Sequence, residues 1–379
     1  MLDNCRIVIL HNIISPYKTS LFREIHAIFH RMEVLYMART ERNRQWHIDT
    51  NELSFPHKIM FKGALDNINP LRLAIRTWIE LDFDDPDVLI LGGYRYSACW
   101  AGFLWAKLNR KKIILWSASN DVDRSRTFLK EKLKGFLVSR CNAANVYGQR
   151  SRDYLVQLGL KKDAIFIKGN TTDNDFYHTR TSQLRAKRDS VRKQFGFTAH
   201  NFLYIGRFSK EKNILHLLKA YKRLERADDW GLILVGAGPQ GEEIEGYVER
   251  YGFKNALMPG FQQKEDMPKF LAASDIFILP SISEPWGLVV NEAMAAGLPV
   301  LVSERCGCYP DLVKEGVNGF SFDPFDSDEL AGLMQNVVDG KYDLISMGEA
   351  SRDIIKDYTP ARAAKSVSEA TEFALSSQK

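Results

Sequence analysis

The segment from residue 276 to residue 302 most constrains the fold, because its pattern is that of a strand, a loop, a helix and a second strand. The uninterrupted apolar run at residues 276–279 is typical of a buried parallel strand. A loop with proline and glycine follows. Residues 288–296 are helix formers with an apolar face, and Gly297 is expected to end this helix. A second strand is expected at residues 298–302. Parallel strands joined by a helix predict an α/β sheet.

Two acidic residues, Glu284 in the loop and Glu292 in the helix, lie in this segment. The loop is at the carboxyl end of the first strand, where open α/β sheets bind ligands. Glu292 lies about one turn into the helix, so both carboxylates can face the same crevice. Alone, Glu292 would be interpreted as a solvated helix acid. Two acids that frame a Pro-Trp-Gly turn at a strand end indicate a binding site instead.

The same alternation of apolar strands and amphipathic helices runs along the rest of the chain and predicts two doubly wound domains. The 379 residues, of which 45% are hydrophobic, suffice for two cores. Residues 171–200 are polar, so we place the domain boundary near residue 180. The first domain is expected at residues 1–180 and the second at residues 181–358, followed by an amphipathic helix within residues 359–379.

The net charge of +5 is slight for this length and predicts no nucleic-acid partner. Two predicted helices, residues 128–140 and residues 184–195, are basic. The first also carries apolar residues, and we expect it to pack on the sheet with a solvated basic face; contact with anionic lipid is the alternative. The apolar run at residues 7–10 is too short for a signal peptide or a spanning helix. We therefore expect a cytoplasmic protein, soluble or peripheral at the inner face of the membrane.

The sequence predicts no metal site and no cofactor. Its five cysteines are scattered, which indicates a reducing compartment rather than a disulfide framework. Cys306 and Cys308 form the closest pair, but no further cysteine or histidine cluster accompanies them. Asp121 and Asp123 resemble a metal-binding acidic pair only weakly, and a capping or loop role is the favoured interpretation.

The first strand of the second domain runs into a turn that contains Gly206, Arg207 and Lys212. Gly206 lets a ligand approach the backbone, and the helix that follows adds N–H groups and a partial positive charge. Either base alone would be a surface charge, but together at a strand-to-helix turn they predict a diphosphate-binding site. Gly236 and Gly238 follow the next strand without the acidic residue that a dinucleotide site needs.

Motifs in the second half of the chain resemble the C-terminal domain of retaining glycosyltransferases of the GT-B fold, within the large family four. They are Gly206-Arg207-Phe208 with Glu211-Lys212-Asn213, Val235-Gly236-Ala237-Gly238-Pro239, and Glu284-Pro285-Trp286-Gly287 through Glu292-Ala293. The resemblance covers most of residues 200–325. It implies two Rossmann-like domains facing a cleft, with the final helix packing back on the first domain. The chain's opening, residues 14–22, looks like bacterial polysaccharide-building members.

The resemblance also implies how the second domain binds a nucleotide diphosphate sugar. Arg207 and Lys212 hold the diphosphate of the donor. Glu292 accepts hydrogen bonds from the ribose hydroxyls, and Phe261 lies near the base. The implied donor is UDP- or GDP-linked, and the implied acceptor is a hydroxyl of a saccharide or of a lipid-linked saccharide.

The transferred sugar is expected to lie on the loop and helix described first. By the resemblance Glu284 contacts this sugar, and backbone N–H groups around Gly287 and Leu288 face its hydroxyls and phosphate. Negative charge develops on the leaving phosphate when the sugar–diphosphate bond breaks. Fixed cations and helix N–H groups stabilise that charge without a metal.

Two departures from the family pattern keep alternatives open. Residues 12–16 lack the glycine pair that many members have after the first strand, and residues 117–120 lack the histidine that touches the sugar. One alternative is a nucleotide-sugar epimerase of the same architecture. The other is a degenerate module that binds a nucleotide sugar without catalysis.

Overall fold

The computed structural model describes residues 4–42, 53–120 and 128–377. The chain divides into two compact units. The first comprises residues 1–121, 125–171 and 359–379, and the second residues 122–124 and 172–358. The C-terminal residues therefore belong to the first unit.

The first unit is built on a parallel sheet with the strand order β3-β2-β1-β4-β5-β6-β7. Its strands are β1 (Ile7–Ile13), β2 (Met32–Ala38), β3 (His57–Ile59), β4 (Val88–Leu91), β5 (Lys112–Ser117), β6 (Ala143–Val146) and β7 (Ile165–Ile167). Its helices are α1 (Pro16–Ile28), α2 (Pro70–Asp84), α3 (Ser97–Leu108), α4 (Phe128–Val138), α5 (Gln149–Gln157) and α15 (Pro360–Ser376).

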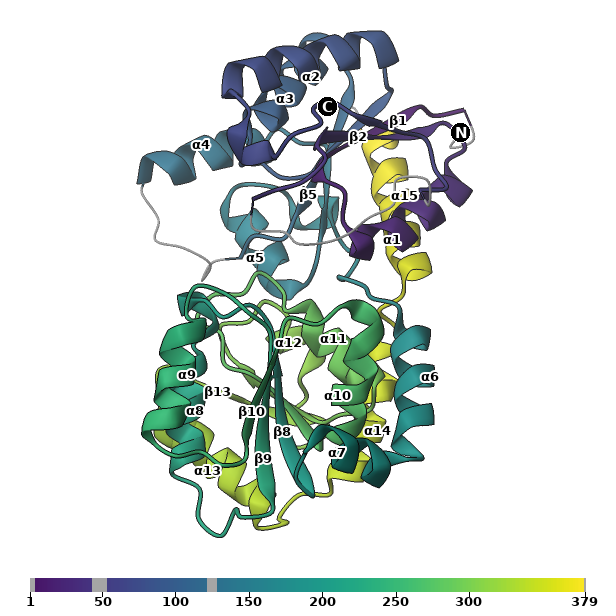
Figure 1. The fold of residues 1–379 in the computed structure, drawn as a ribbon. Coiled ribbons are helices and arrows are strands. Elements are labelled where there is room, and N and C mark those ends of the chain that lie inside the picture. The colour runs from purple at the N-terminus through teal and green to yellow at the C-terminus, as the bar shows by residue number, and fades with distance from the viewer. Residues whose placement is uncertain (1–3, 43–52, 121–127, 378–379) are drawn as a thin grey trace. The chain divides into compact units, whose positions relative to one another are not determined.

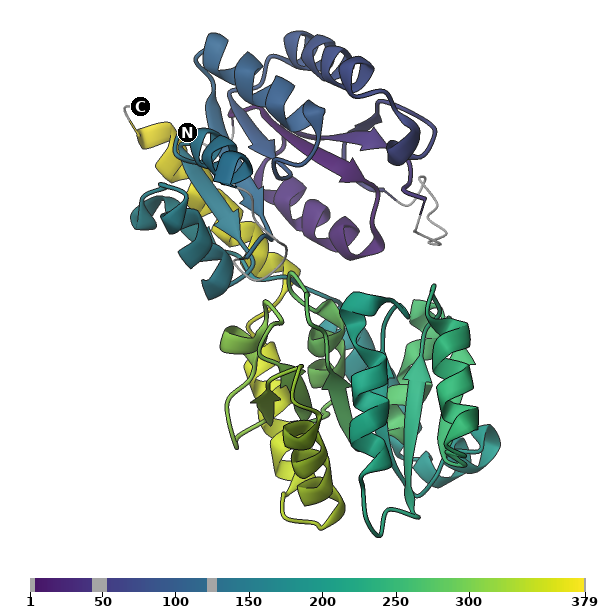
Figure 2. The ribbon, with the colours of Figure 1, turned by 90° about the vertical axis from the view of Figure 1, so that its left-hand side faces the viewer.

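Helices cover both faces of this sheet because neighbouring residues of each strand point to opposite sides. In β1, Ile7 and Ile9 face a core with α1 and α15, while Val8 and Leu10 face a core with α2 and α3. Figures 1 and 2 show α15, in yellow, against the first unit, where it contacts α1 and the strands β5, β6 and β7. Its buried face is mostly alanine, which allows this close approach.

The second unit has a parallel sheet with the order β10-β9-β8-β11-β12-β13. Its strands are β8 (His200–Ile205), β9 (Trp230–Val235), β10 (Ala256–Gly260), β11 (Ile276–Leu279), β12 (Val300–Ser303) and β13 (Gly319–Phe322). Its helices are α6 (Asn174–Arg185), α7 (Arg188–Phe195), α8 (Ile214–Lys222), α9 (Gly241–Arg250), α10 (Met267–Ala273), α11 (Leu288–Ala295), α12 (Tyr309–Leu312), α13 (Ser327–Val338) and α14 (Leu344–Ile355). Contacts group α8 with α9 and α13, and α11 with α6 and α14, on the two sides seen in Figure 1.

The predicted strand, loop, helix and strand are confirmed as β11, α11 and β12. Gly297 follows α11 with a φ of +77°, the left-handed conformation of a helix C-terminus. Within the described residues, no helix combines the length and the apolarity that crossing a bilayer requires.

The prediction of one basic helix at residues 184–195 is wrong, because this stretch contains the end of α6 and the separate helix α7. The side chains of the arginines of α7 are only 25% and 13% exposed. Arg188 and Arg192 form ion pairs with Asp275, each at 2.9 Å, and hydrogen bonds with the carbonyl oxygen of Ala273. These bonds hold α7 against the end of α10. The chain therefore turns between the end of α6 and the start of α7.

Candidate functional site

The site of the second unit lies where the strand order reverses. Strand β8 has β9 on one side and β11 on the other, so the connections after β8 and β11 leave the sheet in opposite directions. Ligands of open α/β sheets bind at the carboxyl ends of the strands at such a point. The predicted residues Gly206 to Lys212 follow β8, and Glu284 to Leu288 follow β11. The topology thus brings the two predicted motifs to one edge of the sheet.

The turn after β8 is held by close backbone packing. A Cβ atom on Gly236 would come within 1.9 Å of the carbonyl oxygen of Gly206, and one on Gly238 within 2.4 Å of that of Phe208. These glycines therefore allow the connection after β9 to lie directly on the turn. The hydroxyl of the buried Tyr204 donates to the carbonyl of Arg207 at 3.1 Å and supports the same turn from below.

Lys212 and Glu284 form an ion pair across the switch point. Lys212 ends a short 3₁₀ helix (Lys210–Lys212), and its side chain is 18% exposed, that of Glu284 15%. The backbone supports the pair, because the N–H of Ile282 donates to the carbonyl of Glu211 at 2.9 Å. The structure thus joins the residue predicted to bind phosphate to the residue predicted to contact the sugar. The sequence did not predict this pairing.

Arg207 is placed differently from Lys212. Its side chain is 48% exposed and pairs with the carboxylate of Glu211 at 2.6 Å. Both predicted phosphate-binding cations are therefore engaged by acids of the same site. An anionic ligand would take the place of Glu211 beside Arg207 and of Glu284 beside Lys212. The two cations are therefore held in position before a ligand binds.

The loop after β11 is locked by its glycine and its tryptophan. Gly287 has a φ of +97°, and a Cβ atom there would come within 2.8 Å of a methyl carbon of Leu279. The indole N–H of the buried Trp286 donates to the side-chain oxygen of Asn291 at 2.8 Å. Leu288 starts α11, and Gly287 as its N-cap residue has no side chain to cover the first turn. That turn can therefore present backbone N–H groups to a ligand.

Glu292 lies within α11 and is only 4% exposed. Burial raises the pKa of its carboxyl group to about 7, against the opposing influence of a hydrogen bond with Tyr177 and the charge of Lys264. Tyr177 comes from α6, and Lys264 follows β10. Neither was predicted, since no motif marks Tyr177 or Lys264 in the sequence. Glu284 instead pairs with Lys212, so the two acids occupy different surroundings.

Phe261 directly follows β10 and is 44% exposed. Its ring is accessible at the carboxyl edge of the same sheet, two strands away from β8. The structure therefore places Phe261 on the ligand-binding edge of the sheet.

Glu292 leads to a prediction about stability. Its pKa is higher in the folded chain than the ordinary 4.5, so the folded state binds more protons between these values and loses stability as the pH rises from about 5 to 8. Glutamine does not titrate, so in Glu292→Gln the decrease in the free energy of unfolding between pH 5 and pH 8 should be smaller by about 1–3 kcal/mol. Urea unfolding of both proteins at pH 5 and pH 8 measures it. Equal losses in the variant and the wild type would contradict the buried, protonated carboxyl group.

No group of His, Cys, Asp or Glu side chains within the described residues has an arrangement suited to a metal ion. Cys306 and Cys308 are both buried beside the loop after β11, where the N–H of Cys308 donates to the carbonyl of Trp286 at 3.0 Å. Asp121 and Asp123, the other pair considered, lie outside the described residues.

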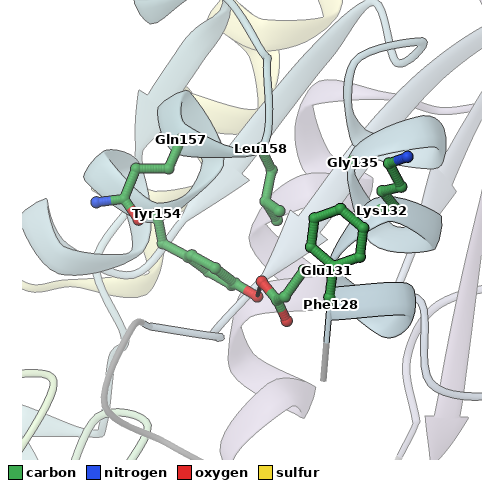
Figure 3. A pocket seen from close by; sticks show the side chains of 7 residues that line it. All are labelled: Phe128, Glu131, Lys132, Gly135, Tyr154, Gln157 and Leu158. Carbon is green, nitrogen blue, oxygen red and sulfur yellow. Dashed lines mark hydrogen bonds between the residues drawn. The ribbon is translucent and has the colours of Figure 1, made fainter. Parts of the chain in front are cut away.

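A pocket of about 350 Å³ lies in the first unit, between α4 and α5. Figure 3 shows the hydroxyl of Tyr154 directed at the carboxylate of Glu131, to which it donates at 2.9 Å, and the ring of Phe128 at the rim. None of the predicted site residues lines it. The pocket is therefore a feature of α4 and α5 and is not part of the ligand site of the second unit.

Residues 187–356 match the family described as glycosyl transferases group 1. A sulfoquinovosyl transferase of Arabidopsis thaliana is 31% identical over 159 residues, which are 41% of this chain and 30% of that protein. A 2-deoxystreptamine glucosyltransferase of Streptomyces kanamyceticus is 25% identical over 252 residues, 65% of this chain and 64% of that protein. The chain thus spans less than two thirds of the length of these curated relatives.

A crystal structure of the Anabaena protein HepE in complex with UDP-glucose has the same fold. It superposes with a TM-score of 0.75 at 19% identity and covers 97% of this chain and 100% of that one. The likeness covers 97% of the chain, whereas the family match covers residues 187–356. Together with the two doubly wound units it confirms the GT-B fold predicted from the sequence.

Proposed function

Residues 187–356 match the glycosyl transferases group 1 family, and from this premise we propose that the chain is a retaining glycosyltransferase. It moves a sugar from a UDP- or GDP-linked donor to a hydroxyl of a saccharide or lipid-linked saccharide. The observation that carries the proposal is the Lys212–Glu284 pair at the switch point. It supplies a cation for a leaving diphosphate and a carboxylate for a sugar at one place.

The chemistry follows from the charges. Breaking the bond between the sugar and the diphosphate leaves negative charge on the departing phosphate oxygen. Lys212, Arg207 and the N–H groups of the first turn of α11 stabilise that charge, because they are fixed before the reaction. The reaction then needs no metal ion. Glu284, released from Lys212 by the phosphate, accepts hydrogen bonds from the hydroxyls of the sugar.

The donor and acceptor classes rest on relatives. The Anabaena protein was crystallised with UDP-glucose, which makes uracil the first base to test. The two curated relatives are named for transfer of sulfoquinovose and of glucose. We propose a sugar or sugar–lipid hydroxyl as the acceptor, in keeping with the resemblance of residues 14–22 to polysaccharide-building members.

The test is an incubation of the pure chain with a panel of UDP- and GDP-sugars and with saccharide and lipid-linked acceptors, with and without a chelator. Glycosylated product with the anomeric configuration of the donor, formed equally with chelator, is the expected result. An absolute magnesium requirement for turnover would contradict the metal-free mechanism. Epimerised sugar without acceptor product would favour an epimerase, and tight donor binding without turnover would favour a non-catalytic module.

We further propose a peripheral contact between α4 and an anionic membrane. We expected α4 to pack its apolar side chains on the sheet, but of these side chains only Leu137 and Val138 are buried. Phe128 and Leu129 are 78% and 77% exposed, and Leu133 is 53% exposed. Its lysines flank these apolar groups, so the exposed surface suits insertion beside lipid phosphates. The bond between Glu131 and Tyr154 holds the helix to α5 (Figure 3).

Binding to lipid should therefore depend on α4. The variant Leu129→Glu/Leu133→Glu is expected to co-sediment with phosphatidylglycerol vesicles about tenfold more weakly than the wild type, since each leucine no longer enters the bilayer. Ile345→Glu is the matched control, because Ile345 is 78% exposed in α14 of the second unit. Wild-type binding that is absent, or that survives the double substitution, would contradict the contact.

A further inference from the structure

Two lysines of the first unit are buried side by side. Lys18 lies in the first turn of α1 and is 8% exposed, and Lys168 directly follows β7 and is 5% exposed. Lysine is almost never fully buried without a partner that offsets its charge. No carboxylate forms an ion pair with either ammonium group in the parts of the chain that the structure covers. These two buried cations therefore need another explanation.

Aromatic rings bring the two ammonium groups together. The Nζ atom of Lys168 lies 4.3 Å from the ring centre of Trp116 and 4.1 Å from that of Tyr147. The Nζ atom of Lys18 lies 5.3 Å and 4.8 Å from the same two rings. Because both lysines share both rings, their charges are close enough to repel. Cation–π contacts offset part of the cost but cannot remove the repulsion.

Few of the lysine protons have acceptors. Lys18 donates to the side-chain oxygen of Asn170 at 3.1 Å, and Lys168 donates to the carbonyl of Gly169 at 3.1 Å. An ammonium group carries three donors, so these bonds leave donor capacity on both. Burial and the charge of Lys18 lower the pKa of Lys168 well below its usual value. The arrangement is costly in itself and would be relieved by an anion.

Other groups at this place also suit a negative charge. The indole N–H of Trp116 is buried and has no acceptor among the described residues. The N-terminus of α1 contributes partial positive charge, and its N-cap residue Ser15 makes no side-chain hydrogen bond to it in the described structure. The ring of His11 is neutral, because burial and the charges of Lys18 and Lys168 lower its pKa to about 4. Three kinds of hydrogen-bond donor therefore meet here: the lysine ammonium groups, the indole N–H and the N–H groups at the start of α1. No acidic side chain is described among them.

The sheet explains how residues so distant in sequence meet. Lys18 follows β1, Trp116 lies on β5, Tyr147 follows β6 and Lys168 follows β7. All of these strands are parallel, so their carboxyl ends lie along one edge. This is the edge at which α/β sheets bind ligands.

We propose that Lys18 and Lys168, walled by Trp116 and Tyr147, form a subsite for an oxyanion group of the acceptor, a phosphate or a carboxylate. The subsite rests on the proposed function for its biological ligand. The two lysines bind the anionic oxygens, and the aromatic rings contact the sugar or carbon skeleton that bears them. The acceptor is then an acidic saccharide or a sugar phosphate, whereas a neutral saccharide would leave both charges unmatched.

Inorganic phosphate tests the subsite directly, provided that the second unit is silenced. Calorimetric titration of Arg207→Ala/Lys212→Ala with phosphate reports the first unit alone. Adding Lys18→Gln, which can still donate to Asn170, should weaken phosphate binding about tenfold or more. Lys168→Met should do the same without unfolding the chain, since it keeps the apolar stem. Lys162→Gln, on the exposed surface of the same unit, is the matched control and should change nothing.

Titrations with glucuronate, glucose 6-phosphate and glucose separate carboxylate from phosphate ligands and both from neutral sugars. Phosphate binding that is absent, or unchanged by Lys18→Gln, would overturn the subsite and leave the lysines with a structural role. Thermal unfolding of each variant identifies loss of folding. Failure of the proposed function is distinguishable, because UDP binding by the wild type reports the second unit, while phosphate binding in the silenced background reports the first.

Discussion

Replacing Lys212 by alanine is expected to weaken UDP binding by about 10- to 100-fold, more than any other single change among the predicted phosphate ligands. Its side chain is mostly buried beside Glu284, where a charge-assisted hydrogen bond to phosphate is poorly screened. Removing Lys212 also leaves the carboxylate of Glu284 without its cation next to the diphosphate. Repulsion between the two anions then adds to the loss of the lysine contact.

Arg207→Ala should have a smaller effect, since Arg207 is half exposed and its ion pair with Glu211 is open to solvent. Lys210→Ala is the matched control, because Lys210 is exposed on the same 3₁₀ helix. The variant Lys212→Ala/Glu284→Ala should bind UDP better than Lys212→Ala alone, since the uncompensated carboxylate is gone. Calorimetry with UDP measures all four variants. Unchanged affinity in both Lys212→Ala and Arg207→Ala would refute the diphosphate site.

Sequence periodicity predicted the fold well because both sheets are parallel and buried. A strand covered on both faces is a continuous apolar run, as at β4 and β11, and it is easily distinguished from the helices between. The end of the helix at Gly297 was predicted equally well, and this glycine has the expected left-handed conformation. The same reasoning placed the motifs with Lys212 and Glu284 at strand ends. It could not predict that they meet, because contact across the sheet depends on the order of the strands.

The same limit explains the features that the sequence did not predict. Lys18 and Lys168 meet only because β1 and β7 are parallel members of one sheet. Tyr177 reaches Glu292 from a helix in the polar stretch of residues 171–200, where we placed the domain boundary. The exposure of Phe128 was missed because an amphipathic pattern predicts an apolar face but not what covers it. In each case the sequence around the residue predicted its helix or strand. The residues that contact it come from distant parts of the chain, which a local pattern does not specify.

Alanine substitutions of the two acids Glu292 and Glu284 should impair the enzyme in different ways. Glu292 is expected to bind the ribose of the donor, a group that does not react, so its contribution is nearly equal in the ground state and the transition state. Glu292→Ala should therefore raise KM roughly tenfold and leave kcat almost unchanged. Glu292→Gln is the conservative control, since it fills the same buried space beside Tyr177.

Glu284 is expected to act on the transferred sugar, where charge and ring shape change during the reaction. Glu284→Ala should lower kcat on the order of a hundredfold and raise KM much less, because the lost interaction strengthens in the transition state. Glu284→Gln separates charge from shape, and Lys212 then loses its partner without losing packing. Steady-state kinetics with a saturating acceptor measures both parameters. If Glu292 governed turnover and Glu284 only affinity, the roles of the two acids would have to be exchanged, since the residue that senses the transition state is the one that controls kcat.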